Sequence, residues 1–96
     1  MSVILKKDGQ VLHVALSGEL NVASAGSLYE ELFAQIDDDS TLVLDATQVE
    51  RVDTSIAQLV CFASKRVREF HLQAASRAWS DAWAQLGLDR AQPTVR

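Results

Sequence analysis

The sequence predicts an α/β domain in which helices pack on a mixed β-sheet, in the order β-β-α-β-α-β-α. Three observations predict this fold. An Asp-Gly pair separates two short apolar runs near the N-terminus, which indicates a β-hairpin. The stretch TLVLDA at 41–46 has the composition of a central strand. Apolar residues recur at helical spacing on both sides of that stretch, so strands alternate with helices and parallel pairing is expected.

The hairpin is expected to consist of SVILKK and VLHVALSG. In the second run, alternate residues form one wholly apolar set, which we expect to face the core: Leu12, Val14 and Leu16. Gly18 is expected to end this strand.

The first helix is expected within NVASAGSLYEELFAQID, with Asn21 as its N-cap. Its apolar stripe consists of Val22, Ala25, Leu28, Leu32 and Ile36, with Tyr29 and Phe33 beside it. Gly26 weakens this helix by about 1 kcal/mol relative to alanine. The following DDDS is expected to be a solvated turn, because it lacks the spaced glutamate of a calcium loop.

After the central strand, TQVERV is expected to be a connector. A second helix is expected from Thr54, with an apolar stripe of Ile56, Leu59, Val60, Ala63, Val67 and Phe70. HLQAA is expected to be the last strand. Ser76 can cap a final helix that ends at Gly87 and has one side lined by Trp79, Ala82, Trp83 and Leu86.

The composition fits one domain, which we place at 1–90, followed by a flexible tail at 91–96. The net charge of −4 argues against nucleic-acid binding and against a polybasic membrane contact. No apolar run approaches the ~20 residues of a membrane-spanning helix, so no membrane insertion is expected. The N-terminus lacks the pattern of a signal peptide, and a cytoplasmic location is therefore expected.

Few residues in the chain suggest catalysis. His13, His71 and the single cysteine, Cys61, are the candidates, and each is more often a structural residue than a catalytic one. No Cys/His spacing resembles a zinc site, and there is no glycine-rich phosphate loop or G-x-S-x-G elbow. We therefore expect a non-enzymatic protein without metal or cofactor. A small enzyme that relies on these three residues is a third and weaker possibility.

The polar patch VDTS lies where the second helix should begin. Asp53 and Thr54 are both residue types that cap helices, and capping alone would explain them. A hydroxyl at a helix N-terminus is also a good position for a phosphate, because the free N–H groups and the helix dipole favour negative charge. Thr54 and Ser55 are therefore candidate switch residues, with Asp53 in support.

One arc of the second helix points away from its apolar stripe and contains Ser55, Gln58, Phe62, Lys65 and Glu69. Phe62 is a large apolar side chain where solvent is expected, which makes it a candidate anchor for a partner. Gln58 and Lys65 lie in the same arc. We therefore expect Gln58, Phe62 and Lys65 to contact a protein partner.

Over about residues 3–88 the chain resembles the STAS domain family, named for sulfate transporters and anti-sigma-factor antagonists. LSGELNVASAGSLYEEL is similar to the family's strand, Gly-Glu-Leu turn and first helix. LVLDATQVERVDTSIAQLV resembles its central strand, connector and switch helix, and is the most specific of the matching segments. LQAASRAWSDAWAQLGL is similar to the last strand and helix.

The resemblance implies a STAS-like fold and a bacterial signalling role. In anti-sigma-factor antagonists of this family, a partner serine kinase phosphorylates the residue that corresponds to Thr54. The unphosphorylated antagonist binds that kinase, which then releases its sigma factor. Other members accompany chemotaxis gene clusters, and VDTSIAQLV is most similar to these. In the alternative, members that are subunits of phospholipid-transport ABC systems contact the ATPase subunit through the corresponding threonine.

Two positions differ from many family members. Ile56 stands where glycine is frequent, and it either packs into the core or alters the surface that a kinase contacts. Asn21 stands where aspartate often follows Gly-Glu-Leu. Asn21 can still cap a helix, but it removes a negative charge from the expected partner surface.

Overall fold

The computed structural model describes residues 2–86, and it confirms the predicted order of elements and the mixed sheet. The sheet has the strand order β1-β2-β3-β4. β1 pairs antiparallel with β2, whereas the β2–β3 and β3–β4 pairs are parallel. The strands are β1 (Ser2–Asp8), β2 (Val11–Leu20), β3 (Thr41–Val52) and β4 (Glu69–Ala75).

The hairpin between β1 and β2 has a two-residue loop, because Asp8 is paired with Val11. Gly9 takes the first central position of this turn with a φ of +61°, a left-handed conformation that glycine adopts without strain. The prediction that Gly18 ends β2 is wrong, since the strand continues to Leu20. Gly18 instead has a φ of +78° beside a shift in register, where it lets the strand bend and remain paired with β3.

β3 is longer than predicted, because the expected connector TQVERV continues the strand to Val52. Its first half, up to Ala46, pairs with both β2 and β4, whereas among the described strands its second half pairs only with β2. Within residues 2–86 the other edge of this second half has no strand beside it. Val49 is buried while the residues around it are largely exposed, which explains why the stretch resembles a loop in sequence.

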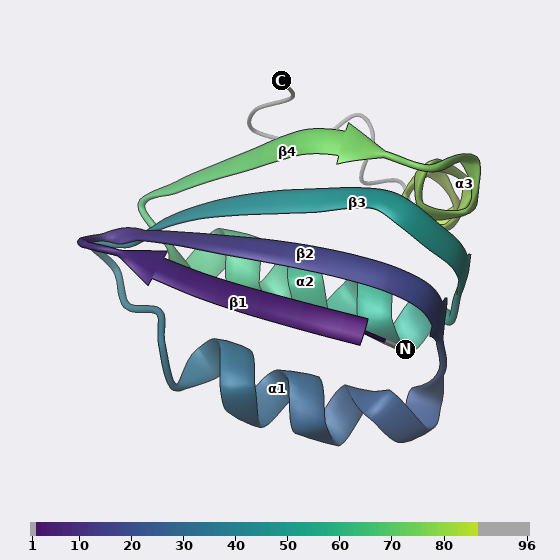
Figure 1. Ribbon diagram of the computed structural model, residues 1–96, viewed down its shortest axis with the longest axis horizontal. Coiled ribbons are helices and arrows are strands. Elements are labelled where there is room, and N and C mark those ends of the chain that lie inside the picture. The colour runs from purple at the N-terminus through teal and green to yellow at the C-terminus, as the bar shows by residue number, and fades with distance from the viewer. Residues whose placement is uncertain (1, 87–96) are drawn as a thin grey trace.

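The helices cover one face of the sheet, and Figure 1 shows α2 lying behind the strands with α1 and α3 on either side. They are the 3₁₀ helix η1 (Val22–Ser24) and the α-helices α1 (Ala25–Phe33), α2 (Thr54–Arg66) and α3 (Arg77–Gln85). The helix predicted over 22–36 is shorter than expected, since it starts with the 3₁₀ turn and ends at Phe33. Val22 is 65% exposed instead of joining the core.

Local sequence correctly identifies two helix starts. The Asp53 carboxylate accepts a hydrogen bond of 2.8 Å from the Ser55 N–H at the start of α2. The Ser76 hydroxyl accepts one of 3.2 Å from the Trp79 N–H at the start of α3. Each cap satisfies an N–H group that would otherwise lack a partner in the first helical turn.

The core lies between the sheet and the helices. Leu12, Val14 and Leu16 face it as predicted, and all three are buried. α2 ends at Arg66, so Phe70 does not belong to its apolar stripe as predicted but lies on β4. Phe70 and the tryptophans of α3 form a stacked aromatic cluster, with ring centroids 6.1 Å apart for Phe70–Trp83 and 5.5 Å for Trp79–Trp83.

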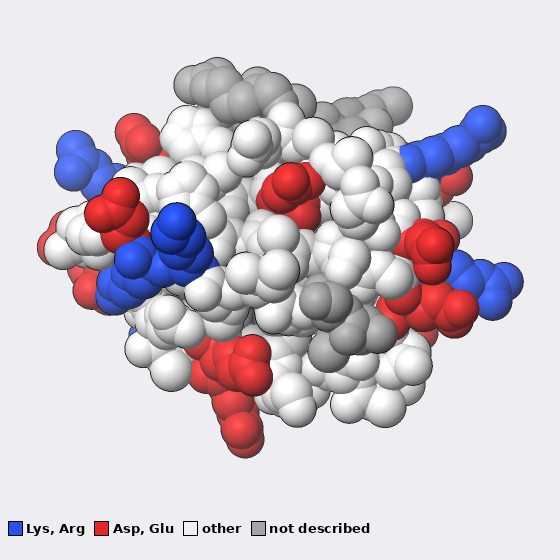
Figure 2. Space-filling model, in the orientation of Figure 1, with Lys and Arg blue, Asp and Glu red and all other residues white. Residues whose placement is uncertain are grey.

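The other face of the sheet carries no helix within residues 2–86. His13, Val43 and His71 are register partners across β2, β3 and β4, and their side chains lie on this face, exposed or half-buried. Figure 2 shows it as largely uncharged in the middle, with an acidic side chain near the centre and most charged groups at the margin. Two predictions, the Gly87 helix end and the tail at 91–96, fall outside the described residues.

Gly26 gives a direct test of how α1 is stabilised. A Cβ added at this position would meet no heavy atom within 4 Å, and its φ is not in the left-handed region. Replacing Gly26 with alanine should therefore raise the free energy of unfolding by about 0.4–1 kcal/mol, because alanine loses less backbone entropy on entering the helix. Urea denaturation of the two proteins measures this, and a less stable Gly26→Ala variant would contradict it.

Candidate functional site

The starts of α1 and α2 lie together because two backbone hydrogen bonds align the strands that precede them. At one end of the sheet the Thr41 N–H donates to the Gln10 carbonyl at 2.7 Å. At the other end the Asp53 N–H donates to the Leu20 carbonyl at 2.8 Å. β2 and β3 are thereby paired in parallel at both ends, with two shifts in register between them, and the helical segments that follow them start at the same edge of the sheet.

Asp53 is the residue that caps α2. The Ser55 N–H donates to its carboxylate and holds the pKa of Asp53 below its ordinary value, because the bond favours the charged form. Thr54 is then not needed as a cap. Thr54 occupies the first helical position, and its side chain is exposed. Within residues 2–86 this side chain forms no hydrogen bond.

The second predicted switch residue, Ser55, is placed differently. Its side chain is half-buried, and its hydroxyl oxygen is buried without a partner in hydrogen-bonding geometry among the described residues. The hydroxyl is still near enough to Asp53 to contribute a smaller lowering of that pKa. An enzyme in solution could reach Thr54 more readily than Ser55.

The two residues that differ from many family members, Ile56 and Asn21, lie in different environments. Ile56 is 0% exposed and packs into the core, so it is not part of the surface around Thr54. Asn21 precedes η1, but its side chain forms no hydrogen bond with the helix backbone. It accepts a bond of 3.3 Å from the Ser24 hydroxyl instead.

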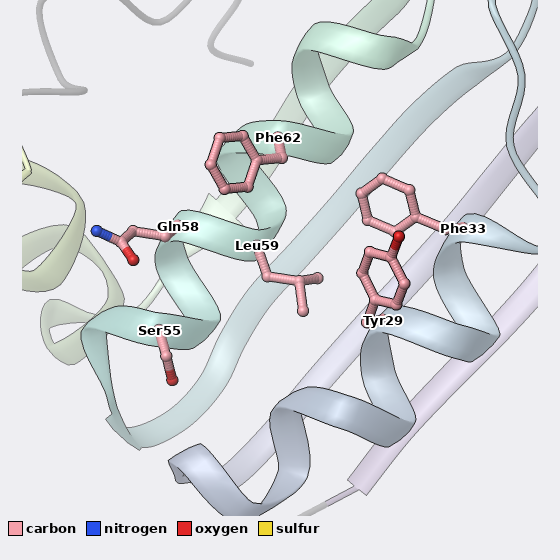
Figure 3. Close-up of a pocket in the computed structure, with 6 residues that line it drawn as sticks. All are labelled: Tyr29, Phe33, Ser55, Gln58, Leu59 and Phe62. Carbon is pink, nitrogen blue, oxygen red and sulfur yellow. The ribbon is translucent and has the colours of Figure 1, made fainter.

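A groove of about 460 Å³ runs between α1 and α2, and its walls are mostly apolar. Figure 3 shows side chains from both helices around it: Tyr29, Phe33, Ser55, Gln58, Leu59 and Phe62. The structure therefore brings together three residues of the predicted arc, Ser55, Gln58 and Phe62. Lys65 is exposed on α2 but does not line the groove, and Glu69 lies on β4 because α2 ends before it.

The wall contributed by α1 was missed by sequence analysis, which placed Tyr29 and Phe33 beside the core stripe. Tyr29 is 54% exposed, and its ring stacks on that of Phe33 with centroids 4.6 Å apart. The Arg66 guanidinium lies over the Phe33 ring, 5.9 Å from its centroid. The sequence contained one sign of this wall, because both aromatic residues stand at the margin of the apolar stripe of α1.

The candidate catalytic residues do not form a common site. His13 and His71 lie on the outer face of the sheet with Val43 between them, and the His71 Nε2 is 3.3 Å from a Glu69 carboxylate oxygen. Cys61 is half-buried on α2. Within 2–86 no three His, Cys, Asp or Glu side chains are grouped so that they could hold a metal ion. In the same range no helix is both long and apolar enough to cross a bilayer.

Solved structures with this fold include anti-sigma factor antagonists. One from Mycobacterium paratuberculosis is similar with a TM-score of 0.82 and 21% identity, over 98% of this chain and 84% of that one. Unphosphorylated SpoIIAA, an anti-sigma factor antagonist, has a TM-score of 0.75 and 14% identity, over 99% and 89% of the two chains. SpoIIAA in its phosphorylated form, described as a Bacillus cell fate determinant, has a TM-score of 0.71 and 13% identity, over 99% and 92%. These likenesses establish the fold.

Sequence comparison gives the family. No curated protein sequence matches the chain. The family model described as "Mlab, STAS domain" matches residues 3–95, which is nearly the whole chain. The family match and the shared fold of the anti-sigma factor antagonists agree with the resemblance found in the sequence. The chain belongs to the STAS domain family.

Proposed function

We propose that this protein is a non-enzymatic regulatory module that binds a protein partner through the start of α2, with Thr54 as the residue whose phosphorylation controls binding. The partner is a serine kinase that acts as an anti-sigma factor, or a component of a chemotaxis-associated signalling system. One observation supports this most directly. Asp53 caps α2, so the exposed Thr54 hydroxyl is free for another use.

The chemistry of the switch needs only what a kinase supplies. The Thr54 hydroxyl oxygen attacks the γ-phosphorus of ATP held by the partner, the hydroxyl loses its proton, and ADP leaves. The phosphate adds about −1.5 to −2 charges at neutral pH. The N-terminus of α2 favours this charge and the Asp53 carboxylate opposes it. The fold is therefore retained while the surface presented to the partner changes.

The residues beside Thr54 supply the contact surface. Phe62 is 66% exposed and Gln58 is exposed one turn before it on α2. A large aromatic group in an exposed position is the kind of side chain that anchors protein interfaces. Lys65 adds a positive charge at the end of this surface. In this proposal Gln58, Phe62 and Lys65 contact the partner, and Thr54 controls whether it binds.

A second candidate function is an accessory subunit of a phospholipid-transport ABC system that contacts its ATPase subunit through α2. The observation in its favour is the apolar groove next to Thr54, because permanent subunit interfaces are more apolar than transient ones. In this case Thr54 would be a contact residue without phosphorylation.

Thr54 substitutions distinguish these functions. Affinity capture from the native cell should recover a kinase with the wild-type chain and with Thr54→Ala, and at least tenfold less with Thr54→Glu, whose charge imitates the phosphate. Intact-mass analysis should find a phosphate on the wild type and none on Thr54→Ala. Ser80→Glu is the matched control, since it adds the same charge at an exposed position of α3.

Two other results of this experiment would contradict the switch. Stoichiometric recovery of an ATPase subunit with an unmodified wild-type chain would establish the transporter function instead. Equal recovery of the partner by wild type and Thr54→Glu would show that Thr54 does not control binding, and would refute the switch.

The role of Asp53 as a charged cap predicts a pH dependence. Its pKa in the folded protein is lowered, so the stabilisation is present above about pH 4 and is lost as pH falls through the folded-state pKa. Asp53→Asn keeps an acceptor for the Ser55 N–H but does not titrate, so stability should fall less steeply below pH 4. Urea unfolding between pH 2.5 and 7 measures this.

Some acid dependence should persist in that variant, because the Thr47 hydroxyl and N–H lower the pKa of Asp45 in the same direction. Identical acid profiles for the wild type and Asp53→Asn would show that the Asp53 charge does not stabilise α2.

A further inference from the structure

Exposed apolar side chains are concentrated on the helical layer beside Thr54. Within residues 2–86, the exposed large hydrophobic residues are Ile4, Val22, Tyr29 and Phe62. Three of these four lie on η1, α1 and α2. η1 packs against both α1 and α2, so this surface is continuous across the three elements. Scattered exposed hydrophobic residues are ordinary, but Tyr29 and Phe62 stand on the two walls of one groove, which indicates a binding surface.

The walls of the groove have the spacing that helices use to pack against one another. On α2 the residues that face α1 recur at intervals of four, three and four positions: Ser55, Leu59, Phe62 and Arg66. On α1 the two residues that line the groove, Tyr29 and Phe33, are four positions apart, and Gly26 lies three positions before Tyr29 on the same side of the helix. These intervals place each set along one side of its helix, as in the heptad pattern of a coiled coil. The two rows run roughly parallel, and a third helix could lie in the groove between them.

Two features of the α1 side would favour binding of such a helix. Stacking of Tyr29 on Phe33, and the Arg66 guanidinium over Phe33, restrict the side chains of the α1 wall before any partner arrives. Gly26 lies one turn before Tyr29 on α1, and the space beside it is open, because a Cβ there would meet nothing within 4 Å. A partner backbone can therefore come close to α1 at this position.

We propose that the groove between α1 and α2 binds an amphipathic helix of the protein partner. This inference rests on the proposed function and specifies the partner segment that the α2 surface recognises. An extended strand fits less well, because both walls are helices whose backbone groups are bonded internally and offer no row of hydrogen bonds. A helix makes its contacts through side chains at the spacing that the walls already have. α2 is 13 residues long, which is about 20 Å, so a partner helix of three to four turns can lie along it.

Charges at the rims of the groove specify the partner helix further. Glu30 is exposed one turn after Gly26, so the α1 rim is negative. Lys65 is exposed one turn after Phe62 and makes the α2 rim positive, whereas the Arg66 guanidinium lies over Phe33 of α1. The bound helix therefore has an apolar seam, basic residues on the side facing α1 and acidic residues on the side facing α2. Such opposite flanks also fix the direction and register of the helix.

Gly26→Gln tests the groove without damaging the fold. The new side chain enters open space, and glutamine is a better helix former than glycine, so the unfolding temperature should equal or exceed that of the wild type. Partner recovery in the affinity capture should nevertheless fall at least tenfold. Ser27→Gln is the matched control, because Ser27 is the next residue on α1, is exposed, and is rotated by about 100° around the helix from the side that carries Gly26, Tyr29 and Phe33. It should recover the partner as the wild type does.

A photo-crosslinker identifies the occupant independently of Thr54. Replacing Tyr29 with p-benzoylphenylalanine in the native cell, followed by mass spectrometry of the adducts, should yield a partner peptide from an amphipathic helix with one basic and one acidic flank. The same replacement at Ser27 should not yield that peptide.

The outcomes separate this proposal from the proposed function. If Thr54→Glu abolishes capture while Gly26→Gln retains it, the switch stands and the groove proposal is wrong. If Thr54→Glu has no effect but Tyr29 crosslinks to an amphipathic helix and Gly26→Gln blocks capture, the groove binds the partner without a switch. Adducts between two copies of this chain, adducts to a non-helical segment, or no adduct would each overturn the groove proposal.

Discussion

The hydrogen bond from the Asp53 N–H to the Leu20 carbonyl is the constraint on which the candidate site depends. It closes the parallel pairing of β2 and β3 at the edge of the sheet where both strands end. Because both chains leave the sheet there, η1 and α2 begin side by side and α1 follows along α2. The place of the α2 start beside η1, and with it the groove between α1 and α2, follows from this alignment of two strands that are far apart in the sequence.

α2 performs two tasks with different sides of one helix. Ile56, Val60 and Ala63 are buried in the core and hold the helix to the sheet. Gln58 and Phe62 are exposed on the opposite side. Since the cap comes from Asp53 and the packing from the inner side, changes at Thr54 or along the outer side can alter binding with little cost to the fold.

The distribution of polar groups around the sheet also follows from its single helical layer. Parallel strands usually have both faces covered, and here one face has no covering helix within residues 2–86. Its strands carry polar groups such as His13 and Asp45 on this face, and the aliphatic side chain of Ile4 is 62% exposed there. The helical side, in contrast, retains exposed aromatic rings. The two faces are therefore chemically distinct, and the apolar one lies beside Thr54.

The sequence by itself determined the order of elements, the inward residues of β2, the caps at Asp53 and Ser76, and Thr54 as the candidate switch. These features depend on local periodicity and on hydrogen bonds between near neighbours, so they can be predicted from short stretches of sequence. Only the tertiary structure decided that β3 continues to Val52, that the Ser55 hydroxyl is buried, and that Tyr29 and Phe33 form a wall opposite Phe62. Each of these depends on contacts between segments distant in the chain, because burial is set by which surfaces meet and not by residue type alone.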